Sequence, residues 1–465
     1  MRVPVEGAKL LGRNASTHSI RIPVLLFLLL GLVQVVALPP FQAPDENVHW
    51  QSAVQRIDRL LGTETCRAEL SLPQHFDVLR VAGRPMEKLP KDLRARFGAA
   101  AQDSTCPLMD VPYGGTLSYP GASLSLLLFR SFPGVGALEA SFYLARLFQG
   151  LLVALGFFVF LRAAEKSGSY SASALGLSAL ALTPLFLQQS FSISSDGVVL
   201  AFALSLAAWV CFSRRSWLTG LAILIFGACA LTTKPVLAPL TLPVVIWMWR
   251  REGNGFWRSP EFGLLLALFA LGTYAGLSSS QAFSSVADSG RDPMRQAALF
   301  REHPGQVLGK LVAQPWSYFL RRRWLRDPLG WLDTPLTKEI WAGIWMIWFS
   351  LGLQARRVLS PPRWFKARSG WALFLAAGTL SAASLVSLYL FLTWTHAGLL
   401  RIDGFQGRYL FPYLILAWSF LAAGLWREEG MPFVRSASWF ERGLFWLGGA
   451  VLAYALVAAF QGRYY

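Results

Sequence analysis

Three ionisable side chains follow an unbroken apolar run near the start of the chain. Asp45, Glu46 and His49 lie within five residues of one another in the stretch LPPFQAPDENVHW, directly after the apolar residues 22–38. One acidic residue is enough to cap the helix that follows, so capping does not explain the second carboxylate. A carboxylate at such a position can act as a general base, and neighbouring polar groups can tune the base or position an acceptor.

Further polar residues stand at the ends of other apolar runs. Asp196 opens one run in SFSISSDGV, and Lys234 separates two runs in LTTKPVLAP. Gln406, Arg408 and Tyr409 open another run in RIDGFQGRYLFPY. A carboxylate set opposite lysine and arginine suits a site that deprotonates a nucleophile and holds a phosphate.

Four more residues complete the set of candidates. Asp333 lies in GWLDTPL, and Arg146 lies inside an apolar run in SFYLARLFQG. Arg146 either joins the other cations in holding a phosphate or pairs with one of the carboxylates. Arg321 and Arg322, in the basic run FLRRRW, either contact lipid head groups or the phosphate, or belong to a solvated face.

Several of these residues also have a purely structural explanation. Asp196 could cap its helix and interact with the helix dipole. Lys234, next to a proline, could be an interface anchor, and Arg408 could extend its charged end to the interface. His49 could be a satisfied surface histidine. The adjacent pair Asp45 and Glu46 is the least easily explained in this way.

The composition is that of a membrane protein with several spans. Of the 465 residues, 54% are hydrophobic and 15% are charged, whereas a soluble domain carries about 25% charge. The net charge of +17 would suit nucleic acid. However, the basic residues cluster in short segments between apolar runs and form no continuous face, which argues against a nucleic-acid partner.

Apolar runs of roughly 17 to 25 residues indicate an all-helical bundle of about eleven membrane spans. The expected spans are 21–38, 139–161, 172–189, 196–212, 217–232, 235–249, 262–279, 339–353, 371–394, 409–426 and 443–460. The chain thus divides into an N-terminus (1–20), a core (21–279) with a hydrophilic segment at 39–138, a second hydrophilic segment at 280–338, and C-terminal helices (339–465).

The two hydrophilic segments have local structure of their own. Residues 51–61 have the pattern of a short helix, and the apolar stretch 122–132 is too short to span, which favours an interfacial or re-entrant helix. Apolar residues recur at helical spacing from 299 to 319, and Pro304, Pro315, Pro328 and Pro335 are expected to break that pattern into short pieces.

The distribution of lysine and arginine predicts the orientation. With the N-terminus in the cytoplasm, 19 lysine and arginine residues lie in cytoplasmic segments, and four lie in short outer loops and the tail. Asp45, Asp196, Lys234 and Arg408 then all face the outside. The first apolar run could instead be a signal peptide, but it is longer than a typical cleavable one.

Cysteines and metal ligands add little. Cys66 and Cys106 share the first outer segment, where a disulfide is permitted, but their spacing does not show that they meet. Cys211 and Cys229 lie in spans. Two carboxylates and one histidine are a weak metal signature, so a divalent cation stays open and no cofactor is assigned. No glycine-rich nucleotide loop is present, which fits a donor presented from the membrane.

Taken together, six motifs resemble a known family. PPFQAPDENVHW, SFYLARLFQG, TPLFLQQSFSISSDGV, LTTKPVLAPL, GWLDTPL and GFQGRYLFPYL resemble, in this order, a bacterial membrane family known only as a domain of unknown function. That family is grouped by resemblance with the GT-C glycosyltransferases, which use polyprenyl-phosphate sugars. The resemblance implies a catalytic acid soon after the first helix, which is Asp45 here, with Glu46 beside it.

The sequence therefore predicts a bacterial inner-membrane glycosyltransferase of GT-C type with its site facing the periplasm or the cell exterior. The donor would be a polyprenyl-phosphate-linked sugar and the acceptor an envelope glycan or lipid-linked molecule. Asp45 would be the general base, and Lys234, Arg408 and Arg146 would hold the phosphate. The rival hypothesis is a transporter or flippase of lipid-linked glycans, which needs charged groups near mid-membrane. A scaffold without activity is a third.

Overall fold

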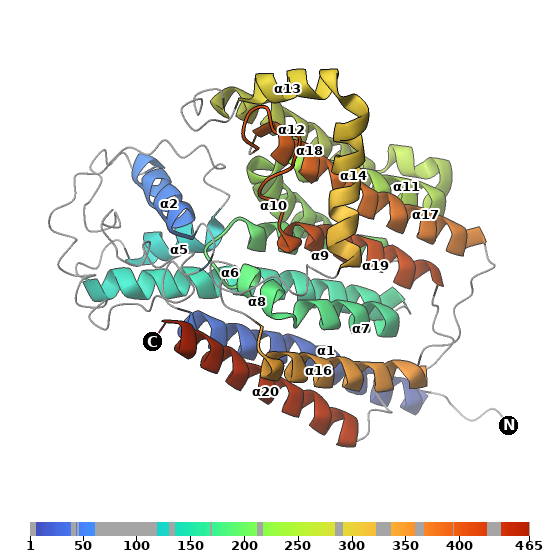
Figure 1. Cartoon of the computed structure of the whole chain (residues 1–465). Coiled ribbons are helices and arrows are strands. Elements are labelled where there is room, and N and C mark those ends of the chain that lie inside the picture. The colour runs from blue at the N-terminus through green and yellow to red at the C-terminus, as the bar shows by residue number, and fades with distance from the viewer. Residues whose placement is uncertain are drawn as a thin grey trace.

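The computed structural model describes residues 6–38, 43, 46–60, 119–129, 135–167, 170–211, 217–283, 292–321, 336–358, 367–393, 395–425 and 439–464. Within these ranges every regular element is a helix (Figure 1). The elements are α1 (Glu6–Ala37), α2 (Glu46–Leu60), α5 (Pro120–Phe129), α6 (Val135–Ser167), α7 (Tyr170–Ala181), α8 (Pro184–Ser190), α9 (Asp196–Cys211), α10 (Trp217–Thr233), η2 (Pro235–Leu240), α11 (Thr241–Glu252), η3 (Gly253–Arg258), α12 (Pro260–Phe283), α13 (Pro293–Glu302), α14 (Pro304–Leu320), α16 (Lys338–Val358), α17 (Ala367–Ala382), α18 (Ser384–Thr393), η5 (Gly407–Leu410), α19 (Phe411–Leu425) and α20 (Trp439–Tyr464).

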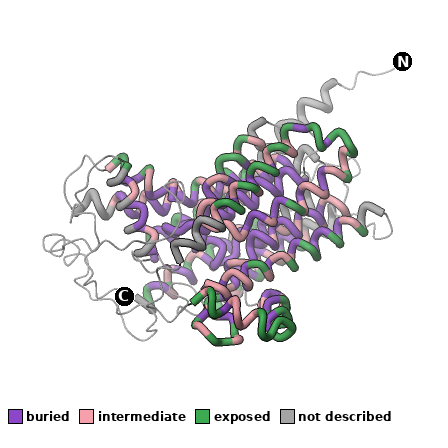
Figure 2. Tube along the Cα trace, turned by 90° about the horizontal axis from the view of Figure 1, so that it is seen from above, coloured by how far each residue is buried: buried purple, intermediate pink, exposed green. Residues whose placement is uncertain are grey.

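The centre of the molecule is α9 together with the residues before it. Every residue from 180 to 210 is buried, and Figure 2 shows buried residues running through the middle of the helical body. Helix α9 packs against α6, α10, α11 and α19. A helix surrounded on all sides must be apolar all round, and α9 carries the sequence DGVVLAFALSLAAWVC. Its first residue, Asp196, is therefore held in the interior of the protein.

Prolines decide where several predicted spans are interrupted. The expected span 172–189 is two helices, α7 and α8, because Pro184 has no N–H to donate and disfavours a helical conformation at the residue before it. Thr183 is indeed extended, with φ −72° and ψ 143°. The expected span 235–249 begins with the 3₁₀ helix η2 at Pro235 before α11 starts. The span 371–394 is also interrupted, but by a turn at Ala383, where the sequence has no proline.

The hydrophilic segments contain the expected helices with different limits. Helix α2 begins at Glu46, five residues before the predicted start, and α5 covers most of the predicted interfacial helix. Helix α5 packs along α6 through buried Gly121, Ala122 and Ser125. The prediction that Pro315 breaks the helix was wrong, because α14 continues through this buried proline to Leu320. The packed surroundings outweigh the one backbone hydrogen bond that a proline removes.

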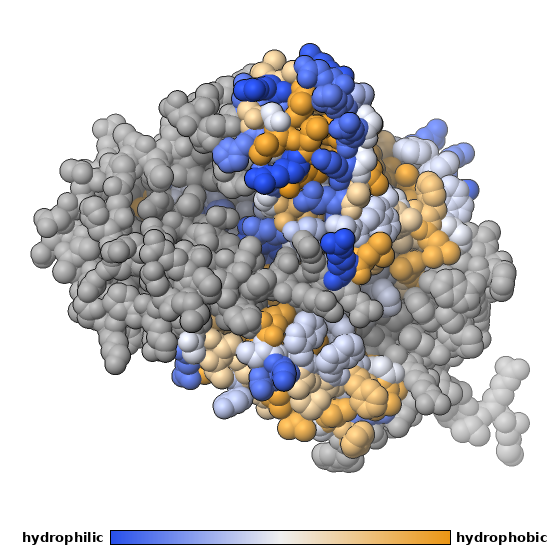
Figure 3. All heavy atoms as spheres, in the orientation of Figure 1, coloured by the Kyte–Doolittle hydropathy of each residue, from blue (hydrophilic) through white to orange (hydrophobic). Residues whose placement is uncertain are grey.

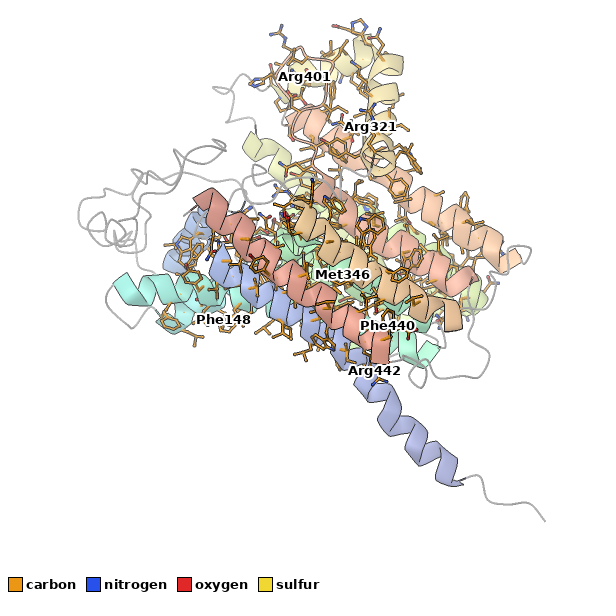
Figure 4. All side chains as sticks on the ribbon, turned by 60° about the horizontal axis from the view of Figure 1, so that its bottom comes forward. Phe148, Arg321, Met346, Arg401, Phe440 and Arg442 are labelled. Atoms are coloured by element: carbon orange, nitrogen blue, oxygen red, sulfur yellow. The ribbon has the colours of Figure 1, made fainter. Side chains whose placement is uncertain are left out.

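The membrane character is clear from three long apolar helices. Within the described residues, Ala140–Ala163, Gly370–Thr393 and Phe440–Gly462 are long and apolar enough to cross a membrane. The count of eleven spans stays a prediction. Arg321 and Arg401 lie at one end of the molecule in Figure 4, whereas Arg442 lies towards the end where α1 begins. Hydrophilic side chains gather over α13 and α14 in Figure 3.

Candidate functional site

A fully buried ion pair joins α2 to α6. Arg146 Nε donates to Glu46 Oε1 at 2.8 Å, and Arg146 Nη2 donates to Glu46 Oε2 at 2.6 Å. Both side chains are 0% exposed. This two-pronged geometry is the strong form of a charge-assisted hydrogen bond. Of the two alternatives for Arg146, phosphate binding and pairing with a carboxylate, the structure shows the second, and the carboxylate is that of Glu46.

The same pair also forms hydrogen bonds with the end of α1 and with the segment between α8 and α9. Arg146 Nη1 donates to the carbonyl oxygen of Val35 at 3.3 Å and to that of Leu38, both at the end of α1. The backbone N–H of Ile193 donates to Glu46 Oε1 at 3.0 Å. Buried charges need such additional partners to offset their loss of hydration. Because protein groups occupy the guanidinium, the geometry favours a structural role for Arg146 over phosphate binding.

The segment 191–195, between α8 and α9, connects the ion pair of Glu46 and Arg146 to Asp196. The ring of Phe191 lies so close to α1 and α6 that a methyl group at Gly31 or at Gly150 would overlap with it. Two residues further on, Ile193 reaches Glu46. The Asp196 N–H then donates to Ser194 Oγ at 3.3 Å, which caps the start of α9. The ion pair and Asp196 are therefore parts of one continuous, buried arrangement.

Asp196 gathers two cations that are distant in sequence. Lys234 Nζ forms an ion pair with Asp196 Oδ1, and Arg408 Nε lies 3.5 Å from Asp196 Oδ2. The lysine nitrogen lies 5.2 Å from the centre of the Tyr409 ring, and the Arg408 guanidinium carbon lies 5.4 Å from it. The Lys234 side chain is 25% exposed, which leaves part of the cluster open.

Each cation is placed by the start of a short 3₁₀ helix. Lys234 is the residue before η2, where the following Pro235 prevents α10 from continuing. Arg408 lies within η5 and is 8% exposed. Gln406 precedes η5, and its Oε1 is buried with no hydrogen-bond partner among the described residues. The association of Lys234 and Arg408 with Asp196 thus depends on two tight turns.

The loop 395–406, which leads into η5, is held by α13 and α14. Gln296 Nε2 donates to the carbonyl oxygens of Phe391 at 3.3 Å and Leu399 at 3.2 Å, and Gln296 Oε1 accepts from the Gly398 N–H at 2.9 Å. Gly398 has φ 85°, a conformation that favours glycine. These contacts show that the second hydrophilic segment fixes the loop that leads to Arg408.

His49 has a partner that sequence reasoning missed. Its Nδ1 lies 2.8 Å from the hydroxyl of Tyr119, and the two ring centres are 5.2 Å apart. Tyr119 is 1% exposed and directly precedes α5. Tyr119 follows a turn-rich stretch, YGGTLS, but nothing in that pattern points to a contact with α2.

Some predicted residues lie outside the described parts of the chain. These are Asp45, Asp333, Arg322, Cys66 and Cys106. Arg321, the last residue described after α14, is exposed. Within the described residues, no group of three or more His, Cys, Asp or Glu could hold a metal ion. The general base Asp45 therefore stays a prediction from the sequence, and the question of a divalent cation stays open.

Comparison with protein families assigns the chain to a family of membrane proteins. The family described as "Predicted membrane protein (DUF2142)" matches residues 135–417, more than half of the chain. The protein therefore belongs to this family of predicted membrane proteins. No curated protein and no solved structure matched it. Asp196, Lys234 and Arg408 lie inside the matched range, whereas the stretch from Asp45 to His49 lies before it.

Proposed function

We propose that this protein is a glycosyltransferase of GT-C type in the bacterial inner membrane. It would move a sugar from a polyprenyl phosphate to an envelope glycan or another acceptor outside the cytoplasm. The observation that supports this proposal is the cluster of Asp196, Lys234 and Arg408. Three helix ends that are distant in sequence bring these charges together in the part of the chain that the family match covers.

The charges of the cluster suit a phosphate. One carboxylate faces two cations, so this cluster carries one surplus positive charge. Asp196 holds the cations in place before a ligand arrives, and such preorganised charges are more effective than charges that must rearrange. The partly exposed Lys234 is the cation best able to reach a phosphate, while the more buried Arg408 fixes its surroundings.

Both described carboxylates of the site, Glu46 and Asp196, already pair with cations, and this limits which residue can act as the general base. Glu46 binds Arg146 and the Ile193 N–H, and Asp196 forms ion pairs with Lys234 and Arg408. Neither arrangement suits a group that must accept a proton during the reaction. Asp45, which precedes Glu46 in the chain, remains the proposed base. Glu46 is reassigned from tuning that base to anchoring the segment in which it lies.

The proposed reaction is a direct displacement. Asp45 removes the proton from an acceptor hydroxyl, and that oxygen attacks the anomeric carbon of the sugar. The bond from this carbon to the phosphate oxygen breaks, and its electron pair leaves on the polyprenyl phosphate. Lys234 and Arg408 stabilise the negative charge that develops there. One such displacement inverts the configuration of the anomeric carbon.

The test is an assay of purified protein with a panel of polyprenyl-phosphate sugars. Asp45→Asn is expected to lower kcat about 100-fold or more, because it removes a general base. Lys234→Gln is expected to raise the KM of the donor about tenfold, because a charge-assisted contact to phosphate is lost. Glu302→Gln and Lys310→Gln, which change exposed residues of α13 and α14, are the matched controls and should leave both constants unchanged.

The outcomes separate the two hypotheses. Unchanged donor consumption by Asp45→Asn would refute the proposed base. Transport of a labelled lipid-linked sugar across liposomes by wild-type protein, retained in Asp45→Asn and without donor consumption, would establish the transporter instead.

A further inference from the structure

A buried amide at the start of α9 has no hydrogen-bond partner among the described residues. Gln149 of α6 is 2% exposed, and its Nε2 has no hydrogen-bond partner among the described residues. Nearly all buried polar groups in proteins are hydrogen-bonded, because leaving one unpaired costs folding free energy. A hydrophobic side chain of the same size would avoid this cost. The amide therefore calls for an explanation.

The position of the amide is defined by its neighbours. Gln149 is three residues after Arg146 on α6, which places the two side chains on one side of that helix. A methyl group added at Gly197 would overlap with the Gln149 amide. Gly197 directly follows Asp196, so the unpaired donor lies against the first turn of α9, one residue along the chain from the carboxylate that holds Lys234 and Arg408.

The backbone of α6 at Gln149 is tightly packed. A methyl group at Gly121 of α5 would lie 2.8 Å from the Gln149 backbone nitrogen. The next residue, Gly150, is in contact with the Phe191 ring. Gln149 therefore lies where α5, α6 and the start of α9 meet. Gly121 leaves room for its backbone, and Gly197 leaves room for its amide. Helices α6 and α9, which meet at this amide, also carry Arg146 and Asp196.

We propose that Gln149 binds the sugar of the donor. This inference rests on the proposed function, in which Lys234 and Arg408 hold the donor phosphate. The sugar is bonded directly to that phosphate, so its oxygens lie within reach of groups around Asp196. The Gln149 amide nitrogen donates a hydrogen bond to a hydroxyl or carbonyl oxygen of the sugar. A site that loses such a bond discriminates poorly between a sugar and its analogues.

The test separates binding from stability. Gln149→Met keeps the size of the side chain and removes the donor, and Gln149→Leu provides a second apolar variant. Thermal unfolding in detergent is measured alone, with decaprenyl phosphate, and with the sugar-linked decaprenyl phosphate that wild-type protein consumes fastest. The control is Ser178→Ala, which removes a buried and likewise unpaired hydroxyl on α7.

The expected result is a gain in stability with a loss of sugar recognition. Without ligand, both variants should unfold at the same temperature as wild type or higher. Protection by decaprenyl phosphate should be retained, but the additional protection from the sugar should be lost, and the KM of the sugar donor should rise about tenfold. Ser178→Ala should keep both kinds of protection.

Two results would overturn the inference. One is full retention of the sugar-dependent protection and of the KM in both variants. The other is a lower unfolding temperature of both variants without ligand, which would show that the amide has a structural partner. A failure of the proposed function is distinguishable, because wild-type protein itself would then gain no protection from decaprenyl phosphate.

Discussion

At the scale of single residues, burial decides what a charged side chain does. Arg146 and Glu46 are both 0% exposed and satisfy each other, whereas Arg401 and Asp403 form a pair at 2.9 Å in which the arginine is 70% exposed. Both pairs look alike as letters in a sequence. Only the first would leave an uncompensated charge in the interior if one partner were removed.

This contrast gives a prediction for stability. Arg146→Ala is expected to lower the free energy of unfolding by about 3–5 kcal/mol, because Glu46 then keeps its buried charge without a counter-charge. Arg401→Ala, the matched control, should lower it by less than about 1 kcal/mol. Denaturant unfolding in one detergent measures both. Similar losses in the two variants would contradict the structural role assigned to the buried pair.

The residue scale also shows the limits of prediction from sequence. The sequence identified Asp196, Lys234 and Arg408 as candidates because ionisable residues at the ends of apolar runs are costly. It left two roles open for Arg146, holding a phosphate or pairing with a carboxylate, since the sequence does not show which groups lie next to it. Tyr119 and Gln149 were missed altogether, because a tyrosine or glutamine near an apolar run is common. Only the packing shows that Tyr119 contacts His49 of α2 and that Gln149 lies against the start of α9.

At the scale of elements, close approach of helices depends on small residues. Phe191 packs against Gly31 of α1 and Gly150 of α6, and its ring centre lies 5.2 Å from that of Phe27. The ring is thereby enclosed between the two helices, and the residues after it reach Glu46 and Asp196. The position of the candidate site thus depends on the distance between α1 and α6.

We expect Gly150→Ala to destabilise the protein by about 1–3 kcal/mol, because the added methyl group overpacks the contact with Phe191. Gly378→Ala in α17 is the control, since nothing lies within 4 Å of a methyl group there. That substitution should stabilise the protein by up to about 1 kcal/mol through helix propensity. Thermal or denaturant unfolding distinguishes the two, and equal effects would show that the contact with Phe191 is not tight.

The elements themselves were largely predictable, but not all of their interruptions were. Apolar length located a helix at each expected span. The break at Thr183 follows from Pro184, whereas the break at Ala383 and the continuation of α14 through Pro315 do not follow from the local sequence. A proline disfavours a helix by a fixed local effect, and tertiary contacts either follow this preference or override it.

At the scale of the whole molecule, the orientation in the membrane is predicted from the distribution of lysine and arginine residues. The N-terminus and the segment around Gly255 are expected in the cytoplasm, and the segment containing α13 is expected outside. Met294 of α13 is 77% exposed, and Gly255 of η3 is exposed with nothing within 4 Å of an added methyl group. Both positions are therefore suited to chemical labelling.

The corresponding experiment uses a variant in which all four native cysteines are replaced. In intact cells, a membrane-impermeant maleimide should label Met294→Cys and should not label Gly255→Cys. After permeabilisation, both should be labelled. The reverse pattern in intact cells would place the candidate site in the cytoplasm. The proposal of a polyprenyl-phosphate donor would then lose its main support, which is that the site faces the outside.

The sequence by itself determined the class of protein, the helices, the predicted orientation and most of the candidate residues. These follow from local properties, namely apolar length, the position of prolines and the cost of charge near lipid. The tertiary structure decided that Glu46 pairs with Arg146 and that Asp196 holds Lys234 and Arg408. It also placed the Gln149 amide, which has no partner among the described residues, against the first turn of α9. Such pairings depend on which helix ends meet, and the packing of α1, α6, α8 and α9 sets this over more than a hundred residues of sequence.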